Sequence, residues 1–146
     1  MVGRDTRDAS VSVADAFIGG VRKSEVNVVN TGVSTTDRTA MAASHYGGIG
    51  VMVTASHHAW ERTGFKFLYE AGNGFTNDDL DRVESLFRDD PDLSGDGSLL
   101  TVQNEFDETY IETAVATVEE EAGGIDATVV VDAVGGAERT AAAVLE

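Results

Sequence analysis

The segment 54–58, TASHH, places a hydroxyl group and two imidazoles directly after a hydrophobic run, and Lys66 follows a short way along the chain. A serine hydroxyl can carry a phosphoryl group covalently, and a histidine can transfer a proton near neutral pH. A lysine ammonium is a compact cation for phosphate oxygens. Phosphoryl transfer asks a protein mainly for positioning and charge neutralisation. Ser56, His57 and Lys66 are therefore the candidate residues for phosphate chemistry.

Each candidate also has a purely structural interpretation. Ser56 could be a turn residue or a helix cap, and His57 could be a solvated loop residue. Lys66 could point to water from an edge strand. Arg4 and Arg7, near the start of the chain, could hold a loop instead of contacting phosphate. The residue types alone leave both interpretations open.

Two predicted strands must position these residues. Segment 49–54 (IGVMVT) is almost continuously apolar, which is typical of a strand covered on both faces. Segment 65–70 (FKFLYE) predicts a second strand, and Gly64 allows the chain to bend before it. Open α/β sheets bind ligands at the carboxyl ends of their strands. We therefore expect an exposed Ser56 hydroxyl at that edge, with Lys66 reaching back towards it.

Four further segments have the apolar spacing of helices, and one is rich in β-branched residues. Val13, Phe17 and Val21 lie four positions apart, which places them on one helical face. Thr36 or Asp37 can cap a second helix. The predicted helices are 10–22, 37–47, 77–88 and 105–122, and the remaining strand of this part is 26–30.

The alternation of helices and strands predicts an α/β fold, a three-layer α/β/α domain with a mixed, mostly parallel sheet. We expect residues 1–122 to form this domain. Segment 128–136 (TVVVDAVGG) predicts a fresh strand, so 123–146 would begin a second, truncated domain. VGRDTR (2–7) has the pattern of a strand end and its loop, with the strand itself missing. Both ends therefore indicate part of a longer protein.

Composition restricts the class of protein. The chain has 146 residues, 42% of them apolar, which is sufficient for one domain with a core. It contains no cysteine, so disulfides and thiolate metal sites are excluded. No run is long and apolar enough to span a membrane, and the N-terminus lacks a signal-peptide pattern. We expect a cytoplasmic protein.

The charge is the strongest compositional signal. Asp and Glu number 26 against 10 Lys and Arg, which gives a formal net charge of −16. Such a field repels nucleic acid and anionic membranes, so neither is an expected partner. Acid enrichment with only two lysines is typical of a protein adapted to molar salt, where repulsion is screened. We interpret the chain as halophilic, with an ordinary acidic protein as the alternative.

Four segments together resemble a known family. TASHHAWERTGFKF (54–67) resembles the active-site segment of the α-D-phosphohexomutases, the phosphoglucomutase and phosphomannomutase family, in which T-[AG]-S-H-N-P precedes N-G-x-K. VGRDTR (2–7) is similar to the family's G-x-D-x-R turn, and NTGVSTTD (30–37) lies where the family has a G-x-x-P-T-P loop. TVVVDAVGG (128–136) is similar to the start of the family's second domain. The four segments occur in the family's order.

The resemblance implies a phosphohexomutase of carbohydrate metabolism. Such an enzyme interconverts hexose 1-phosphate and hexose 6-phosphate through a phosphoserine and a bisphosphate intermediate. By position in the motif, Ser56 would carry the phosphate, His57 would be the general acid/base or a phosphate contact, and Lys66 would steady the transferring phosphate. The resemblance also implies a phosphosugar substrate and Mg²⁺, with Ser56 as one metal ligand through its phosphate.

The chain also departs from the family pattern. His58-Ala59 stands in place of Asn-Pro, and Thr63 in place of the Asn before the glycine. The Asp-rich loop D-G-D-x-D-R, which supplies the family's other Mg²⁺ ligands, does not occur in this sequence. A second class of function therefore remains open: a catalytically incompetent fragment that only folds, or that binds a separate chain carrying the missing domains. The residues do not choose between glucose, mannose and glucosamine phosphates.

Overall fold

The computed structural model describes residues 1–89, 91–102 and 105–122, together with residues 128, 130 and 132. The chain divides into two compact units, Met1–Val102 and Gln103–Glu146. The first unit contains the sheet and three helices, and the described part of the second contains one helix, α4 (Glu105–Ala122). The strand predicted at 128–136 and the second domain predicted at 123–146 lie outside the described residues, apart from those isolated positions.

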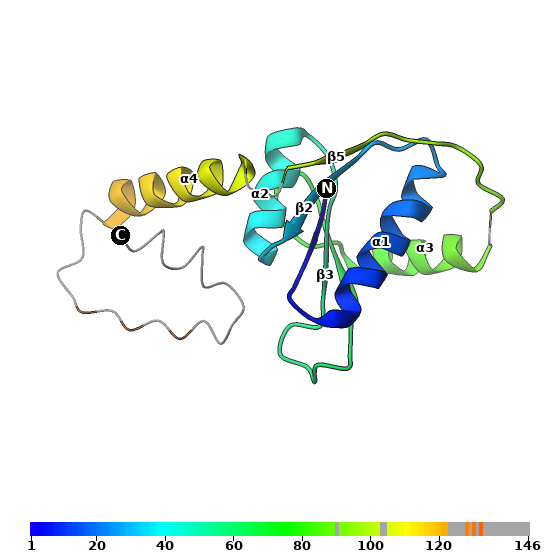
Figure 1. The fold of residues 1–146 in the computed structure, drawn as a ribbon, viewed down its shortest axis with the longest axis horizontal. Coiled ribbons are helices and arrows are strands. Elements are labelled where there is room, and N and C mark those ends of the chain that lie inside the picture. Colours follow the sequence, from blue (N-terminus) through cyan, green and yellow to red (C-terminus); the bar gives the residue numbers. More distant parts are fainter. Residues whose placement is uncertain (90, 103–104, 123–127, 129, 131, 133–146) are drawn as a thin grey trace. The chain divides into compact units, whose positions relative to one another are not determined.

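The first unit is built on one five-stranded sheet with the strand order β4-β3-β1-β2-β5. Strands β1, β2, β3 and β5 run parallel to their neighbours, and β4 is antiparallel to β3. The sheet is thus mixed and mostly parallel, as predicted. The strands are β1 (Val2–Arg4), β2 (Val28–Val33), β3 (Gly50–Thr54), β4 (Gly64–Leu68) and β5 (Leu99–Thr101), and the helices are α1 (Asp8–Arg22), α2 (Thr36–Tyr46) and α3 (Asn77–Arg88) (Figure 1).

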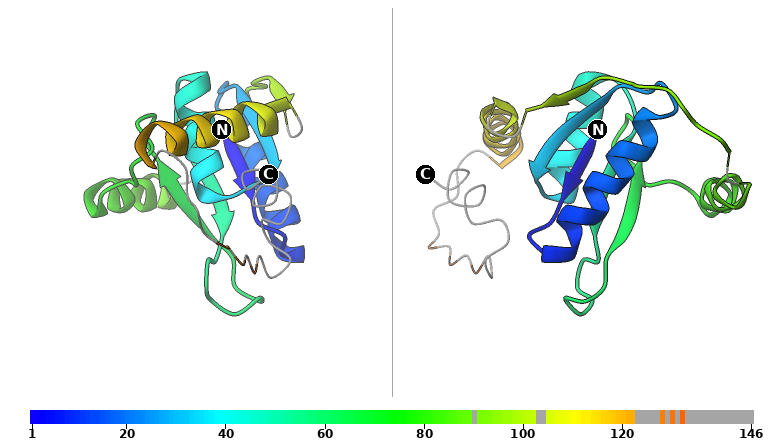
Figure 2. Two further views of the ribbon diagram at one scale, coloured as in Figure 1. Left: turned by 90° about the vertical axis from the view of Figure 1, so that its left-hand side faces the viewer. Right: turned by 45° about the vertical axis from the view of Figure 1, so that its right-hand side comes forward.

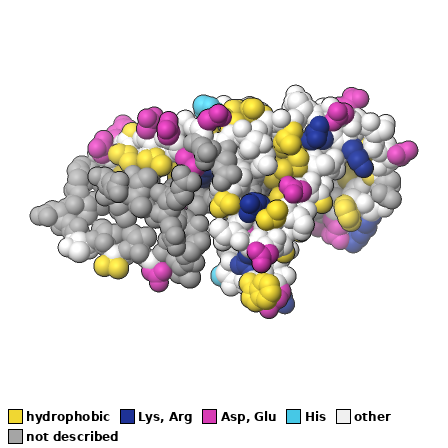
Figure 3. Space-filling view, viewed as in Figure 1, with side chains coloured by type: hydrophobic (Ala, Val, Ile, Leu, Met, Phe, Trp, Pro, Cys, Tyr) yellow, Lys and Arg dark blue, Asp and Glu magenta, His cyan; other side chains and the backbone are white. Residues whose placement is uncertain are grey.

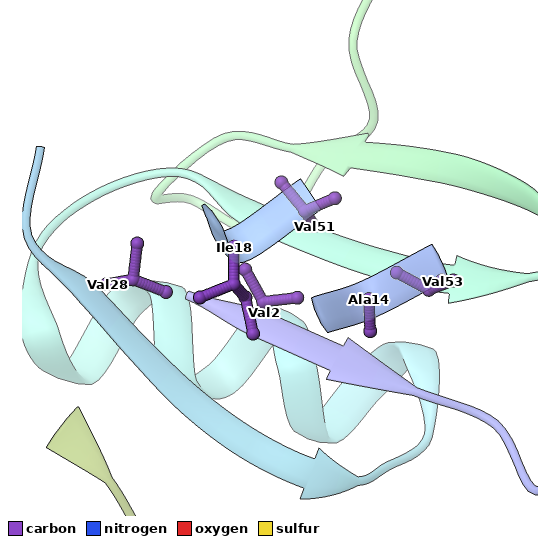
Figure 4. Close-up of a cluster of buried hydrophobic side chains, with 6 residues drawn as sticks. All are labelled: Val2, Ala14, Ile18, Val28, Val51 and Val53. Carbon is purple, nitrogen blue, oxygen red and sulfur yellow. The ribbon is translucent and has the colours of Figure 1, made fainter. Parts of the chain in front are cut away.

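Helices α1 and α2 cover opposite faces of this sheet (Figures 1 and 2). Odd-numbered residues of β3 meet α1: Val51 and Val53 belong to one buried cluster with Ala14 and Ile18 (Figure 4). Even-numbered residues of β3 meet α2: Met52 Sδ lies 3.5 Å from Thr39 Oγ1. Successive side chains of a strand point to opposite faces, so β3 is covered on both sides. The continuous apolar pattern of 49–54 is explained by this position.

The predicted apolar face of α1 is confirmed. Val13, Phe17 and Val21 pack against the buried cluster from its margin, while Ala14 and Ile18 lie inside it. The helix carries its two glycines, Gly19 and Gly20, in its last turns without a break.

Replacing both Gly19 and Gly20 with alanine should raise the free energy of unfolding by roughly 1–2 kcal/mol, because glycine is a poor helix former. A Cβ atom at either position meets nothing within 4 Å. Urea unfolding of the double variant measures the gain. Gly3→Ala is the opposite control: its Cβ would lie 2.4 Å from Thr39 Oγ1 and 2.8 Å from Ser34 Cβ, which should cost about 1–3 kcal/mol. Equal stability of the double variant and the wild type would contradict the prediction.

Several boundaries differ from those predicted. The N-cap of α2 is Thr35, whose side chain accepts from the backbone N–H of Arg38, so the expectation of Thr36 or Asp37 was wrong by one position or more. Three adjacent hydroxyl or carboxylate residues can all cap, and only the backbone geometry selects one. Strand β2 begins at Val28 and continues to Val33, beyond the predicted 26–30.

Strand β5 was not predicted. It has only three residues and all are exposed, so it shows no alternation of apolar and polar side chains. The preceding segment is held against the α1–β2 turn by hydrogen bonds from the Gly95 and Gly97 N–H groups to the carbonyl oxygens of Lys23 and Arg22. A Cβ at Gly97 would lie 2.0 Å from the Val26 carbonyl oxygen. Gly95 and Gly97 thus allow the backbone of this segment to lie close to the backbone of the α1–β2 turn. This contact places β5 beside β2 in the sheet.

Helix α3 forms over the predicted residues 77–88 but buries none of its side chains. It begins with a capping box, in which Thr76 and Asp79 each bond the backbone of the other. Its apolar residues are largely exposed: Leu80 by 42% and Phe87 by 84%. Val83 is an exception, since it lines an apolar cavity of about 730 Å³ together with Phe17 and Val21 of α1. Local capping, and not burial of side chains, therefore accounts for much of the stability of helix α3.

Candidate active site

Three loops meet at the carboxyl ends of the central parallel strands. The Asp5 N–H, after β1, donates to the carbonyl oxygen of Val53 in β3 at 3.0 Å. The Ser34 N–H, after β2, donates to the carbonyl oxygen of Arg4 at 2.8 Å. The longest of the three, residues 55–63, follows β3 and extends beyond the edge of the sheet (Figures 1 and 2). We call residues 55–63 the serine loop, because Ser56 lies near its start.

The carboxylate of Asp5 is the centre of a hydrogen-bond network beneath the serine loop. Its Oδ1 accepts from the Ser10 hydroxyl and the Arg7 N–H, and its Oδ2 accepts from the Thr54 hydroxyl at 2.8 Å and from Arg7 Nε at 2.9 Å. Burial alone would raise the pKa of Asp5, but the hydrogen bonds from Ser10, Thr54 and Arg7 outweigh it and lower the pKa below its ordinary value. Asp5 therefore stays ionised.

Arg7 connects this network to the serine loop. Its Nη2 donates to the carbonyl oxygens of Ser56 and His58 at 2.8 and 2.9 Å. Its Nη1 donates to the carbonyl oxygens of Ala59 and Arg62 at 2.7 and 3.4 Å. Loop residues some fifty positions away in the sequence are thus held by one side chain. The structure shows that Arg7 holds the loop, the structural alternative considered for it above.

Ser56 has an unusual backbone conformation. Its φ of 53° lies in the left-handed region, which non-glycine residues seldom adopt. The Ser56 N–H donates to Thr54 Oγ1 at 2.9 Å, and the His58 N–H donates to the Ala55 carbonyl oxygen at 3.0 Å. These bonds form a tight turn directly at the end of β3. The Ser56 residue is exposed, which agrees with the sequence-based expectation for this edge.

The two histidines of the motif lie on the exposed side of the same turn. The rings of His57 and His58 are stacked, with centroids 4.7 Å apart. Both residues are exposed. His57 is therefore adjacent to Ser56 in the turn and accessible to a ligand. Trp60, further along the loop, is 71% exposed.

Lys66 lies on β4, where it is paired with Met52 of β3. Two positions further along the register, Gly64 is paired with Thr54, so Lys66 and Thr54 lie diagonally on the same face of the sheet. Diagonal neighbours are within reach of long side chains. Lys66 is exposed, and its side chain forms no hydrogen bond or ion pair with Ser56 or any other residue in the described parts of the chain. The contact between Lys66 and Ser56 stays a prediction.

The described residues do not fit a magnesium site. They include no group of three or more His, Asp or Glu side chains able to hold a metal ion. Asp5, which lies beneath the serine loop, has both carboxylate oxygens occupied by hydroxyl and N–H donors. A phosphorylated Ser56 would be one ligand residue only, with no cluster of acids or histidines around it among the described residues.

Sequence reasoning missed the role of Asp5, Ser10 and Thr54 in supporting the site. Asp5 and Arg7 were visible as parts of the VGRDTR turn, yet their contacts depend on β1 lying beside β3, which a sequence does not show. Thr54 was part of the quoted motif, and its hydroxyl bonds both Asp5 and the Ser56 N–H. The useful signal is a polar side chain at the last position of a buried strand.

Comparison with known proteins identifies the family of this chain. Residues 1–93 match the family described as phosphoglucomutase/phosphomannomutase, alpha/beta/alpha domain I. The chain therefore belongs to the phosphoglucomutase/phosphomannomutase family. The predicted resemblance to this family is thus confirmed.

Individual relatives give the extent of the similarity. A phosphoglucosamine mutase of Corynebacterium glutamicum (strain R) is 32% identical over 142 residues, which cover 94% of this chain and 31% of that protein. A phosphoglucomutase/phosphomannomutase of Thermococcus kodakarensis is 34% identical over 88 residues, covering 60% of this chain and 19% of that protein. A crystal structure of a family member from Burkholderia thailandensis superimposes with a TM-score of 0.66 at 26% identity, covering 79% of this chain and 26% of that one. The chain spans about a third of such relatives or less.

No membrane-spanning candidate occurs among the described helices, because none is both long and apolar enough to cross a bilayer.

Proposed function

We propose that this chain forms the phosphoserine domain of a cytoplasmic phosphohexomutase, which interconverts hexose 1-phosphate and hexose 6-phosphate through a bisphosphate intermediate. One observation carries the proposal: Ser56 is exposed at the carboxyl end of β3, in a turn that Arg7 and Thr54 hold from beneath. The names of the relatives support a sugar phosphate as the substrate class.

In the proposed reaction, the bond between phosphorus and Ser56 Oγ breaks as a bond forms between phosphorus and a hydroxyl oxygen of a hexose monophosphate. The proton of that hydroxyl ends on Ser56 Oγ by way of a base, for which His57 is the candidate. The bisphosphate then gives its other phosphoryl group to Ser56 Oγ: the bond between that phosphorus and its sugar oxygen breaks, and this oxygen takes the proton that leaves Ser56 Oγ. Lys66 is the candidate cation for the transferring group, since it is exposed on the strand next to β3.

The 146-residue chain alone should show no measurable conversion of hexose 1-phosphate to 6-phosphate. The sequence has no Asp-rich loop, and the described residues include no metal-binding cluster. A coupled assay with Mg²⁺ and a bisphosphate activator measures this. Turnover that disappears in Ser56→Ala would contradict the prediction while supporting the assignment of the serine. Turnover on mixing with a second chain that carries the missing domains would support the alternative of a two-chain enzyme.

Ser56 should nevertheless accept a phosphoryl group from a hexose 1,6-bisphosphate. We expect mass spectrometry after incubation to find an added phosphate on the peptide that contains Ser56, and none in Ser56→Ala. Ser85→Ala is the matched control, because Ser85 is an exposed serine on α3 and its loss should leave the labelling unchanged. Phosphate on another residue, with none on Ser56, would overturn the proposed site.

A further inference from the structure

Arg7 has no hydrogen-bond donor to spare. A guanidinium group carries five N–H donors in a fixed fork, and the structure provides five acceptors: the Asp5 carboxylate and the carbonyl oxygens of four serine-loop residues, Ser56, His58, Ala59 and Arg62. The Arg7 side chain is only 16% exposed. An arginine close to a phosphate-bearing serine would ordinarily be assigned to phosphate binding, and here its donors are already occupied.

Two acceptors of Arg7 lie at and just after Ser56, the loop residue with the left-handed backbone conformation. Ser56 holds a left-handed φ of 53°, and such conformations persist only where the surrounding structure determines them. The carbonyl group of Ser56 itself, and that of His58 two residues later, are both fixed by Nη2. The N–H groups of Ser56 and His58 are bonded to Thr54 and Ala55 within the loop's own turn. The Thr54 hydroxyl connects the Ser56 N–H to Asp5, which follows β1. Arg7 connects the carbonyl side of the turn to the same carboxylate.

We propose that Arg7 is the positioning residue of the phosphoserine: its guanidinium holds four loop carbonyl oxygens, keeps Ser56 in the left-handed conformation, and contacts no phosphate oxygen. The proposal rests on the proposed function of Ser56 as phosphate acceptor and deepens it. Arg7 thus acts on phosphoryl transfer only through the backbone, while the charge facing the phosphate comes from elsewhere. The positive charge of Arg7 is balanced by the Asp5 carboxylate, 2.9 Å from Nε.

The test uses Arg7→Lys and Arg7→Ala in the 146-residue chain. Lysine keeps the charge but has one ammonium group, which cannot reach four carbonyl oxygens in a fork geometry. Arg22→Gln is the matched control, because the Arg22 guanidinium likewise holds a distant segment through Asp96 and the Gly97 carbonyl oxygen. If Arg7→Ala fails to fold, Arg7→Lys carries the test.

The first readout is the order of the loop, which does not depend on any activity. Amide hydrogen exchange at Ser56, His58 and Arg62 should become about tenfold faster or more in both Arg7 variants, and stay at the wild-type rate in Arg22→Gln. Trp60 is the only tryptophan and lies in the loop, so its fluorescence anisotropy should fall in the Arg7 variants alone. Unchanged exchange and anisotropy in a folded Arg7 variant would overturn the proposal.

The second readout is phosphorylation of Ser56 by hexose 1,6-bisphosphate. We expect the labelling rate to fall by roughly 10- to 100-fold in both Arg7 variants, since small displacements of a reacting group have effects of this size. Arg22→Gln should label at the wild-type rate. Equal labelling of Arg7→Lys and the wild type would overturn the proposal. If the wild type is not labelled, the proposed function of Ser56 fails, and loop order alone decides the role of Arg7.

Discussion

Replacing Asp5 with alanine should lower the free energy of unfolding by about 2–4 kcal/mol, since hydrogen bonds to a charged group contribute strongly and their loss leaves polar partners unpaired. The carboxylate accepts from Ser10 in α1, from Arg7 at the N-cap of the same helix, and from Thr54 at the end of β3. Denaturant unfolding at neutral pH measures the loss. Asp5→Asn should lower the free energy of unfolding somewhat less than Asp5→Ala, because the asparagine amide keeps one acceptor oxygen.

The control for Asp5 is Asp15→Asn, which removes the same charge from an exposed position on α1. In a chain of net charge −16, this change should be neutral or slightly stabilising, because it reduces self-repulsion. The two Asp→Asn variants should therefore differ in the sign of their effect. Equal effects of Asp5→Asn and Asp15→Asn would contradict the importance assigned to the network.

The network also predicts a dependence on pH. The pKa of Asp5 is lower in the folded protein than its ordinary value of 3.8, because the Ser10, Thr54 and Arg7 hydrogen bonds outweigh burial. Because the pKa is lowered on folding, ionised Asp5 contributes its full stabilisation when the pH is above the pKa of the unfolded state, about 3.8. This contribution is lost as the pH falls from there through the lower pKa of the folded state. Between pH 5 and pH 3, the wild type should lose more stability than Asp5→Asn does.

Thermal stability should rise steeply with salt. We expect a gain of about 2–3 kcal/mol between low salt and molar KCl, or roughly 10 °C in Tm, because the Debye length shrinks to ~3 Å at 1 M. Acidic side chains are spread over the described surface in view in Figure 3, so the repulsion is not confined to one site. Thermal melts over a KCl series measure the effect. A Tm that is flat or falls with salt would refute the halophilic interpretation.

A charge variant separates screening from general effects of salt on protein solubility. Asp15, Glu61 and Glu70 are exposed, and replacing them with the corresponding amides leaves their shapes nearly unchanged. The triple variant should start with a higher Tm at low salt and gain less on adding KCl. The same salt response in the triple variant and the wild type would indicate that exclusion of salt from the surface, not charge screening, raises the Tm.

Strong local patterns were sufficient to predict most of the fold. The buried strand at 49–54 and the helix over 77–88 were predicted almost to the residue, because a continuous apolar run and a first turn rich in acids are local signals. Strand β5 could not be predicted, since its residues are exposed and its place depends on the close backbone contact of Gly97 with Val26. A short edge strand is specified by its neighbours in space.

Some features of the candidate site could likewise be predicted from the sequence, and others could not. Exposure of Ser56 followed from the end of an apolar strand, so that part was predictable from the sequence. The left-handed backbone of Ser56 and the five contacts of Arg7 were not, because they require β1 and β3 to be adjacent. Strands β1 and β3 are about fifty residues apart in the sequence, so the sequence does not show that they are neighbours. Whether Lys66 meets the phosphate stays a prediction, since the register of β4 places Lys66 beside β3 but its side chain forms no hydrogen bond or ion pair with Ser56.

The central place of β1 has a consequence for how quickly the protein folds. Val2 is paired with Asn30 on one side and with Val51 on the other. Strand β1 therefore cannot complete its two ladders until residues about thirty, and then about fifty, positions later in the chain have been made. Because distant pairings close large loops before they gain contacts, folding should take milliseconds to seconds instead of microseconds. The serine loop would be among the last parts to order, since Arg7 holds it only after β3 has joined β1.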